Sequence, residues 1–234
     1  MDAEPPAEPP AIPRAEPRAE PPAEPPAELR AELRAELARR VAKDQAARRS
    51  LDGAAMKAAD EENLPWLKQV VADVGWPGTS LVGAAGAHDA WLLVQHADGD
   101  PAFQRQCLEL LTAAAGHGEA SWREVAYLTD RVLLAEGKPQ EFGTQATARD
   151  GKYVARKLRD PAGVNDRRTL MGLGPLAPYL DQLNKLHGPP EPATVACHAC
   201  GTAIEFWLPD DGNTLTLTCP SCGEQVTVTV TFRP

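Results

Sequence analysis

Four cysteines near the end of the chain constrain its folding more than any other feature. They occur as Cys-His-Ala-Cys-Gly and Cys-Pro-Ser-Cys-Gly, and eighteen residues separate the two pairs. This spacing is typical of a four-thiolate zinc site, which is tetrahedral and leaves no coordination position open for catalysis. We therefore predict one structural Zn²⁺ bound by Cys197, Cys200, Cys219 and Cys222.

The residues around the cysteines resemble a zinc ribbon over Thr194–Arg233. Apolar and polar residues alternate there, which predicts short antiparallel strands with a turn at Asp210–Asn213. Gly201 and Gly223 follow the two pairs and allow the positive φ of a tight turn. The alternative is two disulfides. We disfavour it because the chain begins Met-Asp-Ala-Glu, without the basic start of a secretory leader, so the thiols are expected to stay reduced.

The charge of this segment distinguishes two kinds of partner. Between Glu191 and Pro234 five acidic residues accompany a single basic residue, Arg233. Nucleic-acid binding depends on Lys and Arg that neutralise phosphates, so we predict no nucleic-acid partner. The alternation places Trp207 opposite Phe206, outside the small core. We therefore predict a protein partner with a basic surface, contacted through Trp207.

The N-terminal segment consists of four-residue repeats that run from Ala3 to Ala38. The first six units carry prolines, which exclude a helix and predict a disordered or polyproline-like arm over residues 1–26. Such an arm is either a solvated spacer or a ligand for an SH3-type partner. In the last three units Leu and Arg replace the prolines, so a helix is expected from about Ala27, with an apolar stripe of Leu29, Leu33, Leu37 and Val41.

Hydropathy and charge limit the cellular locations that are compatible with the sequence. The net charge is −9, and the arm and the zinc-ribbon segment account for all of it. No apolar run approaches the roughly 20 residues of a membrane span. We therefore predict a cytoplasmic protein without a membrane partner.

Residues 27–188 have the pattern of one mainly helical domain. Pro189, Pro190 and Pro192 separate it from a zinc-ribbon domain over residues 194–234. The predicted fold class is mainly α: a helical domain with a short β-like hairpin, a small β zinc-ribbon module and a disordered proline-rich arm. The expected elements are helices over 27–50 and 121–136, helices ending near Val74 and Ala97, a helix from Pro101 capped by Asp100, a hairpin turn at Asp150-Gly151, and two short helices flanking 172–175.

Polar residues in apolar surroundings are the candidate functional residues of this domain. Asp130 and Arg131 lie within a predicted helix whose neighbouring positions are mostly apolar, so we expect a coupled, partly buried pair. His96 is followed two residues later by Asp98, a carboxylate that is able to orient its ring. We expect six further residues to support this polar site: Asp44, Gln45, Arg48, Gln95, Gln104 and Gln145.

Several short sequence blocks follow one another along the domain. They are Asp44-Gln45-x-x-Arg48, Gly75-Trp76-Pro77, Leu81-Val82-Gly83, Gln95-His96-Ala97-Asp98, Gln104, Asp130-Arg131 and Gly137 through Gln140 to Gly143-Thr144-Gln145. Together they resemble the signature of an uncharacterised bacterial family, a domain of unknown function. The resemblance covers about Leu33 to Leu183. It implies a shared helical fold and supplies no activity. Phe142 stands where the family usually has tyrosine.

Two classes of function remain open for the helical domain. In the first, it is an enzyme in which His96 is the general acid or base, Asp98 or another carboxylate orients it, and Arg131 binds an anionic group. In the second, the same residues form an internal hydrogen-bond network, and the protein is an adaptor whose arm and ribbon contact partners.

The sequence lacks the motifs that are typical of several other kinds of active site. The sequence contains no Gly-rich phosphate loop, no G-x-S-x-G elbow and no HExxH motif for a His/Asp metal site. Cys107 is flanked by Phe103, Leu110 and Leu111 on its predicted helix, so we interpret it as a core thiol and not as a nucleophile.

Overall fold

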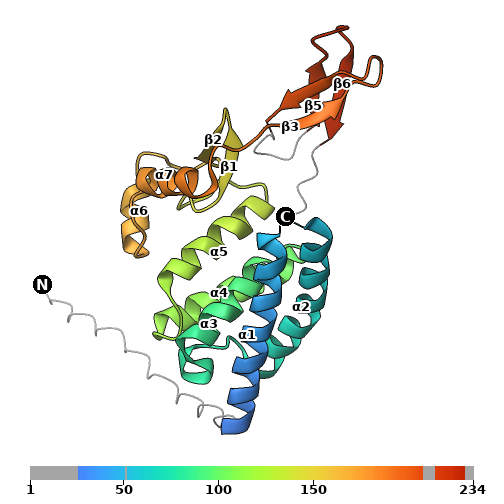
Figure 1. The fold of residues 1–234 in the computed structure, drawn as a ribbon. Coiled ribbons are helices and arrows are strands. Elements are labelled where there is room, and N and C mark those ends of the chain that lie inside the picture. Colours follow the sequence, from blue (N-terminus) through green and yellow to red (C-terminus); the bar gives the residue numbers. More distant parts are fainter. Residues whose placement is uncertain (1–25, 51, 208–213, 230–234) are drawn as a thin grey trace, which may run out of the picture.

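A computed structural model of the protein describes residues 26–50, 52–207 and 214–229. Figure 1 shows helices α1 to α5 packed as a bundle, the shorter helices α6 and α7 with a small hairpin beyond α5, and a separate group of strands that extends away from the bundle. The helices are α1 (Ala27–Arg49), α2 (Gly53–Val74), α3 (Thr79–Gln95), α4 (Pro101–Gly116), α5 (Trp122–Ala135), α6 (Val164–Leu170) and α7 (Leu176–His187).

An apolar core stabilises the bundle, and helices α1 to α5 all contribute residues to it. Leu37 of α1 is fully buried, so the predicted stripe does pack inward, whereas Leu29, in the first turn of α1, is 48% exposed. Helix α3 approaches α1 closely at Gly86, where a Cβ atom would lie 3.4 Å from Cγ of Arg34. The other core residues include Leu67, Val82, Leu93, Leu111 and Leu128.

Local signals set the ends of the helices as expected. The Asp100 side chain accepts a hydrogen bond from the backbone N–H of Phe103 at 3.0 Å and caps α4, with Pro101 in the first turn. Ser121 and Glu124 form a capping box at the start of α5. Gly75 ends α2 with a φ of 69°, a conformation that glycine adopts without steric cost.

Within the residues that the structure describes, six short strands form three antiparallel pairs. The pair β1 (Ala146–Arg149) and β2 (Lys152–Ala155) confirms the hairpin with its turn at Asp150 and Gly151. The segment between this hairpin and α6 returns to the loop that precedes β1, where Gln140 bridges to Leu158. The other pairs are β3 (Ala193–Ala196) with β4 (Ala203–Phe206), and β5 (Thr214–Thr218) with β6 (Gln225–Thr229).

The strand pairing of this C-terminal module corrects one expectation. The sequence suggested strands joined by a turn at residues 210–213, which lies outside the described residues. Among the described strands, each hairpin instead closes across one cysteine pair, and β4 pairs with β3, a strand that the alternation did not predict. Backbone turns after Cys197 and Cys219 bring the flanking strands together. Cys197, Cys219, Ile204 and Val226 form the small core.

No helix in the described part of the chain combines the length and apolar character that crossing a bilayer requires.

Candidate functional site

The four predicted zinc ligands converge at the end of the C-terminal module. Their four sulfur atoms all lie within 4.8 Å of one another. The Sγ atoms of Cys197 and Cys222 are 3.7 Å apart, and those of Cys200 and Cys219 are 3.6 Å apart. A tetrahedral zinc site with Zn–S bonds of about 2.3 Å has S–S edges of about 3.8 Å. The cluster therefore has the dimensions of a four-thiolate metal site.

The two halves of the cluster repeat the same backbone turn. Cys197 N–H donates to the carbonyl of Thr202 and Cys219 N–H to that of Glu224, both at 2.8 Å. Gly201 and Gly223 adopt φ values of 75° and 76°, as their positions after the pairs predicted. Each turn presents two thiols on the same side, which is how two sequence-distant pairs complete one site.

All five cysteines are free thiols, so the disulfide alternative does not apply to this structure. Cys107 is fully buried in the helical core. Burial raises the pKa of its thiol to about 12, which leaves almost no thiolate near neutral pH. Cys107 is therefore a core residue, as expected.

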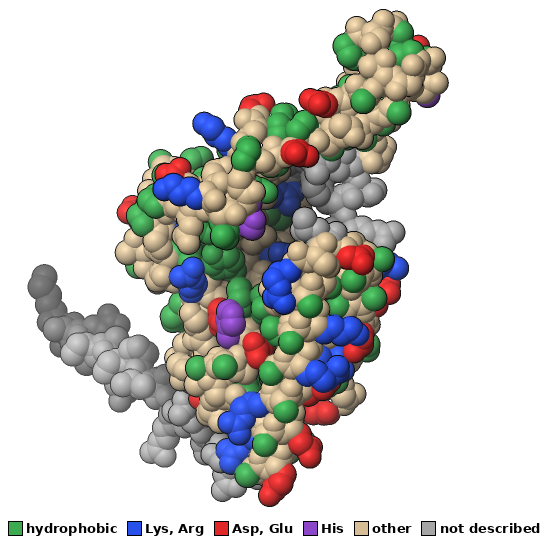
Figure 2. All heavy atoms as spheres, in the orientation of Figure 1, with side chains coloured by type: hydrophobic (Ala, Val, Ile, Leu, Met, Phe, Trp, Pro, Cys, Tyr) green, Lys and Arg blue, Asp and Glu red, His purple; other side chains and the backbone are tan. Residues whose placement is uncertain are grey.

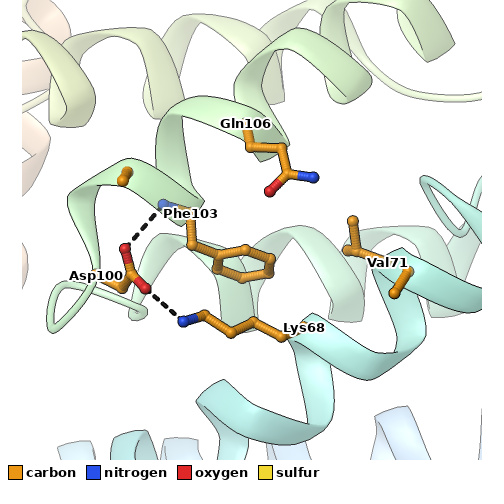
Figure 3. Close-up of a pocket in the computed structure, with 7 residues that line it drawn as sticks. Lys68, Val71, Asp100, Phe103 and Gln106 are labelled. Atoms are coloured by element: carbon orange, nitrogen blue, oxygen red, sulfur yellow. Dashed lines mark hydrogen bonds and ion pairs between the residues drawn. The ribbon is translucent and has the colours of Figure 1, made fainter.

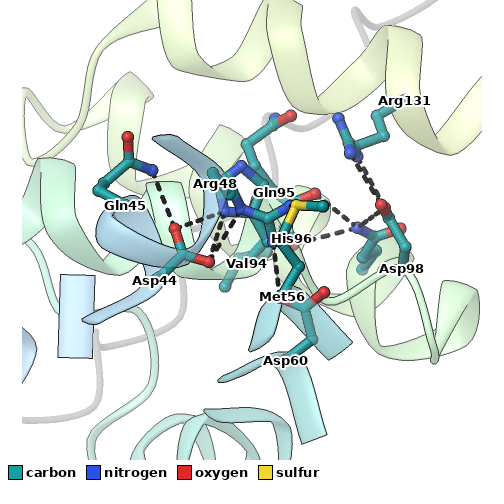
Figure 4. Close-up of polar contacts among 11 residues, drawn as sticks. Asp44, Gln45, Arg48, Met56, Asp60, Val94, Gln95, His96, Asp98 and Arg131 are labelled. Atoms are coloured by element: carbon teal, nitrogen blue, oxygen red, sulfur yellow. Dashed lines mark hydrogen bonds and ion pairs between the residues drawn. The ribbon is translucent and has the colours of Figure 1, made fainter. Parts of the chain in front are cut away.

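The polar residues of the helical domain divide into three groups, and the first is centred on Asp44 of α1. This carboxylate is 1% exposed. It accepts hydrogen bonds from Nδ1 of His96 at 2.9 Å and from Nε of Arg48 at 3.0 Å, and Gln45 donates a third at 2.9 Å. The carboxylate nearest to His96 in space is thus Asp44, fifty-two residues away in sequence, and not Asp98 as the sequence suggested. Figure 4 shows these contacts.

Asp60 of α2 joins this group, although the sequence analysis did not select it. Its Oδ1 accepts from Nη2 of Arg48 at 2.6 Å, so Arg48 bridges two carboxylates on different helices. Burial raises the pKa of Asp60 despite the opposing effect of Arg48. Asp60 follows an alanine-rich stretch and matches none of the recognised blocks, so its role could not be found from the sequence alone.

The second group joins α5 to the loop between α3 and α4. Arg131 donates to both oxygens of Asp98, from Nε at 2.7 Å and from Nη2 at 2.8 Å. Gln104, which is fully buried, donates from Nε2 to Asp98 Oδ1 at 3.0 Å. Gln145 accepts from Arg131 Nη1 at 3.3 Å. In Figure 4 His96 lies between the Asp44 group and this Asp98–Arg131 pair.

The third group surrounds the buried carboxylate of Asp130. Here the predicted pairing of Asp130 with Arg131 is wrong. Asp130 does not bind Arg131. Its oxygens accept from the backbone N–H groups of Glu141, Phe142 and Thr144 at 2.8–3.0 Å and from the Thr144 hydroxyl at 2.9 Å. Consecutive residues of a helix point about 100° apart. Asp130 therefore contacts the loop that follows α5, whereas Arg131 contacts Asp98.

Arg168 of α6 also binds this loop. This side chain is 2% exposed and donates to the carbonyls of Gly174 at 2.6 Å and Phe142 at 2.7 Å. Gln140, fully buried, donates to the carbonyls of Gln145 and Arg156 and accepts from Gln145 N–H. Gln140 belongs to a recognised block, but neither it nor Arg168 was selected as a site residue. Both fix a loop through backbone contacts, which side-chain patterns do not reveal.

Of the residues selected from the sequence, Gln95 has the side chain with the fewest hydrogen bonds to described residues. It is 4% exposed, and its Nε2 is buried without a hydrogen-bond partner among the described residues. Its backbone carbonyl accepts from Gln104 Nε2 at 3.2 Å. Gln95 is thus part of the polar region through its main chain.

The charges of the first two groups nearly cancel. The carboxylates are Asp44, Asp60 and Asp98, and the permanent cations are Arg48 and Arg131. A protonated His96 therefore makes the region neutral. Since Arg131 is bound bidentately by Asp98, it does not offer a free guanidinium to an anion, contrary to its predicted role.

A groove of about 400 Å³ lies elsewhere, between α2 and α4, and is lined by Val71, Ala72, Ala102, Phe103 and Gln106 (Figure 3). Its two charged groups, Lys68 and Asp100, form an ion pair with each other. Asp100 also caps α4. This groove therefore presents no uncompensated charge.

Acid should destabilise the domain through Asp44 and Asp98. Burial raises the pKa of both carboxyls, but the contacts of Asp44 with His96 and of Asp98 with Arg131 outweigh it, so both pKa values lie below the usual range. Between the folded and unfolded pKa values the unfolded chain binds more protons, so this stabilisation is complete above about pH 4 and is lost as the pH falls through the folded values. Urea unfolding from pH 5 to pH 2 should show this loss.

The matched variants for this measurement are Asp98→Asn and Asp166→Asn. Asp98→Asn should flatten the acid dependence, whereas Asp166→Asn, at an exposed position of α6, should leave it unchanged. Equal pH profiles for the wild type and Asp98→Asn would contradict the assignment.

Residues 28–189 match the model of a family of unknown function, DUF6624. The match includes all three polar groups. It ends before the C-terminal module with the four clustered cysteines, which we call the cysteine module. No curated protein and no solved structure matches the chain.

Proposed function

The chain belongs to the family of unknown function DUF6624 over residues 28–189, and on that premise we propose that its helical domain binds a small molecule and transfers a proton at the Asp44–His96 pair. The observation that carries the proposal is the contrast in exposure. The Asp44 carboxylate is 1% exposed, whereas the His96 side chain that it holds is 15% exposed.

The pair has the arrangement of an oriented general base. An ionised carboxylate only accepts hydrogen bonds, so the hydrogen of His96 lies on Nδ1, and Nε2 is left with its lone pair. A buried carboxylate in this position fixes the tautomer and stabilises the imidazolium that forms when Nε2 takes a proton. His96 is the proton-transfer residue, and Asp44 is a positioning residue.

The surrounding charges support this role and change the expected ligand. Protonating His96 brings the region formed with Asp44, Asp60, Asp98, Arg48 and Arg131 to neutrality, so the ring accepts a proton without leaving an uncompensated charge. Both arginines are already held by carboxylates. A neutral or cationic small molecule therefore fits better than the anionic ligand expected from the sequence.

An activated ester tests the pair without knowledge of the natural substrate. An accessible, carboxylate-oriented imidazole should accelerate the hydrolysis of p-nitrophenyl acetate. We expect His96→Gln to remove most of this rate and Asp44→Asn to lower it by about tenfold or more, because the amide favours the wrong tautomer. Release of nitrophenolate is followed by absorbance.

The matched control is His117→Gln, at the end of α4. His117 is exposed, and its Nδ1 contacts the carbonyl of Ala113 without a carboxylate. This variant should keep the wild-type rate. A His96→Gln protein that remains folded by circular dichroism and hydrolyses the ester at the wild-type rate would overturn the proposal.

A second function is favoured by the cysteine cluster. Its four sulfurs fit structural Zn²⁺, and free thiols agree with the cytoplasmic location expected from the sequence. The described residues of the module, 193–207 and 214–229, include Glu205 and Glu224 but no Lys or Arg. This composition favours a basic protein partner over nucleic acid. Trp207, which is half-buried, remains the proposed contact residue.

A further inference from the structure

An aromatic surface lies where α3 and α5 meet and where α7 faces them. The rings of Trp91 and Tyr127 pack edge to face, with centroids 5.9 Å apart and an interplanar angle of 87°. Trp122, in the first turn of α5, is 44% exposed. Tyr179 of α7 donates its hydroxyl hydrogen to the carbonyl of Thr144 and stands beside Arg168. Figure 2 shows hydrophobic side chains gathered in a hollow between the α6–α7 segment and the bundle.

Positive charge accompanies these rings. The guanidinium of Arg123 lies 5.9 Å from the Tyr127 ring centre, and that of Arg168 lies 5.0 Å from the Tyr179 ring centre. Neither arginine forms an ion pair with a carboxylate of the described residues. The acidic side chain of this surface is Glu124, which contacts Nδ1 of His88 at 2.9 Å. The surface therefore combines aromatic rings with an exposed arginine, Arg123, that has no acidic partner among the residues whose positions the structure describes.

Aromatic-lined surfaces of this kind recognise proline-rich segments, whose extended polyproline helix is already ordered and loses little entropy on binding. An arginine beside the rings adds a preference for acidic residues. The N-terminal arm has both properties, because residues 4–25 contain nine prolines and five glutamates against two arginines. We propose that the surface formed by Trp91, Trp122, Arg123, Tyr127 and Tyr179, the aromatic surface, is a docking site for acidic proline-rich segments and that its occupant is the chain's own residues 4–25.

The start of α1 lies close enough for this contact. Arg34 of α1 packs against Gly86 of α3. Ala27 precedes Arg34 by seven residues, or about 10 Å of helix, and Trp91 follows Gly86 by five residues, or about 8 Å. The root of the arm is therefore within about 20 Å of the aromatic surface. A polyproline segment advances about 3.1 Å per residue, so about seven residues cover that distance and the others remain to lie on the surface.

Photo-crosslinking in the full-length protein tests the contact. p-Benzoylphenylalanine replaces Trp122 in one sample and Lys57 in a second, and mass spectrometry identifies the linked peptides. Lys57 is an exposed residue of α2, near the far end of α1. We expect position 122 to link to peptides from residues 4–25 and position 57 not to do so.

Charge reversal tests the role of Arg123. Arg123→Glu should lower the yield of arm cross-links at position 122 by about tenfold, because one attraction becomes a repulsion. Lys57→Glu, the same change on α2, should leave that yield unchanged. Added synthetic peptide of residues 4–25 should compete with the chain's own arm.

Three results would overturn the proposal. The first is cross-linking of the arm at both positions with equal yield, which would mean that the contact is random. The second is the absence of arm cross-links at position 122. The third is linkage only between ¹⁵N-labelled and unlabelled chains, which would assign the surface to a second copy of the protein.

Discussion

Replacing Asp130 by alanine is expected to lower the free energy of unfolding by about 3–5 kcal/mol. Asp130 is fully buried and accepts four hydrogen bonds from the loop over residues 141–144. Its removal leaves the backbone N–H groups of Glu141, Phe142 and Thr144 without this acceptor, and an unsatisfied group that is buried costs about 1–3 kcal/mol. Burial raises the pKa of this carboxyl, so part of the expected loss is offset by the desolvation that alanine avoids. Urea unfolding measures the effect.

The neighbouring arginine provides the control. Arg131→Ala should cost only about 1–2 kcal/mol, because Arg131 and Asp98 are both partly exposed and water can solvate the carboxylate that remains. The pairing expected from the sequence would make Arg131→Ala the larger loss. A cost of Arg131→Ala equal to or above that of Asp130→Ala would therefore contradict the two separate roles.

Removal of zinc is expected to unfold the cysteine module and leave the helical domain folded. Metal binding at four thiolates contributes about 10–16 kcal/mol in small zinc domains, far more than the few buried side chains around Ile204 and Val226. The helical domain has its own core, to which the described residues of the module, 193–207 and 214–229, contribute none. Elemental analysis should find about one zinc per chain. Amide exchange in β3 to β6 should lose protection after chelation or in Cys219→Ser.

Cys107→Ser is the matched variant for this experiment. It makes the same chemical change in the helical core, so it should destabilise the helical domain and leave the zinc content unchanged. Purified protein without zinc, or unchanged exchange in the module of Cys219→Ser, would refute the metal assignment.

The parts of the fold that could be predicted depend on local chemistry. Helix ends follow from residues such as Asp100, Ser121 and Gly75, because a cap or a left-handed turn is formed by residues within one turn of the helix end. The cysteine cluster follows from spacing, since each Cys-x-x-Cys pair forms its own turn before the two pairs meet. The strand β3 was missed because Ala193–Ala196 is short and its alternation is weak.

Candidate polar residues could be selected from the sequence, but their contacts could not be predicted. The sequence alone selected Asp44, His96, Asp98, Asp130 and Arg131 as candidate residues, and for Asp130 and Arg131 the apolar neighbours at helical spacing predicted burial. Only the tertiary structure decided which of them meet. Asp44 reaches His96 because α1 lies along α3, and Asp130 and Arg131 separate because adjacent helix positions point in different directions. Burial is thus recorded in the local pattern, whereas the choice of partner depends on how distant helices pack.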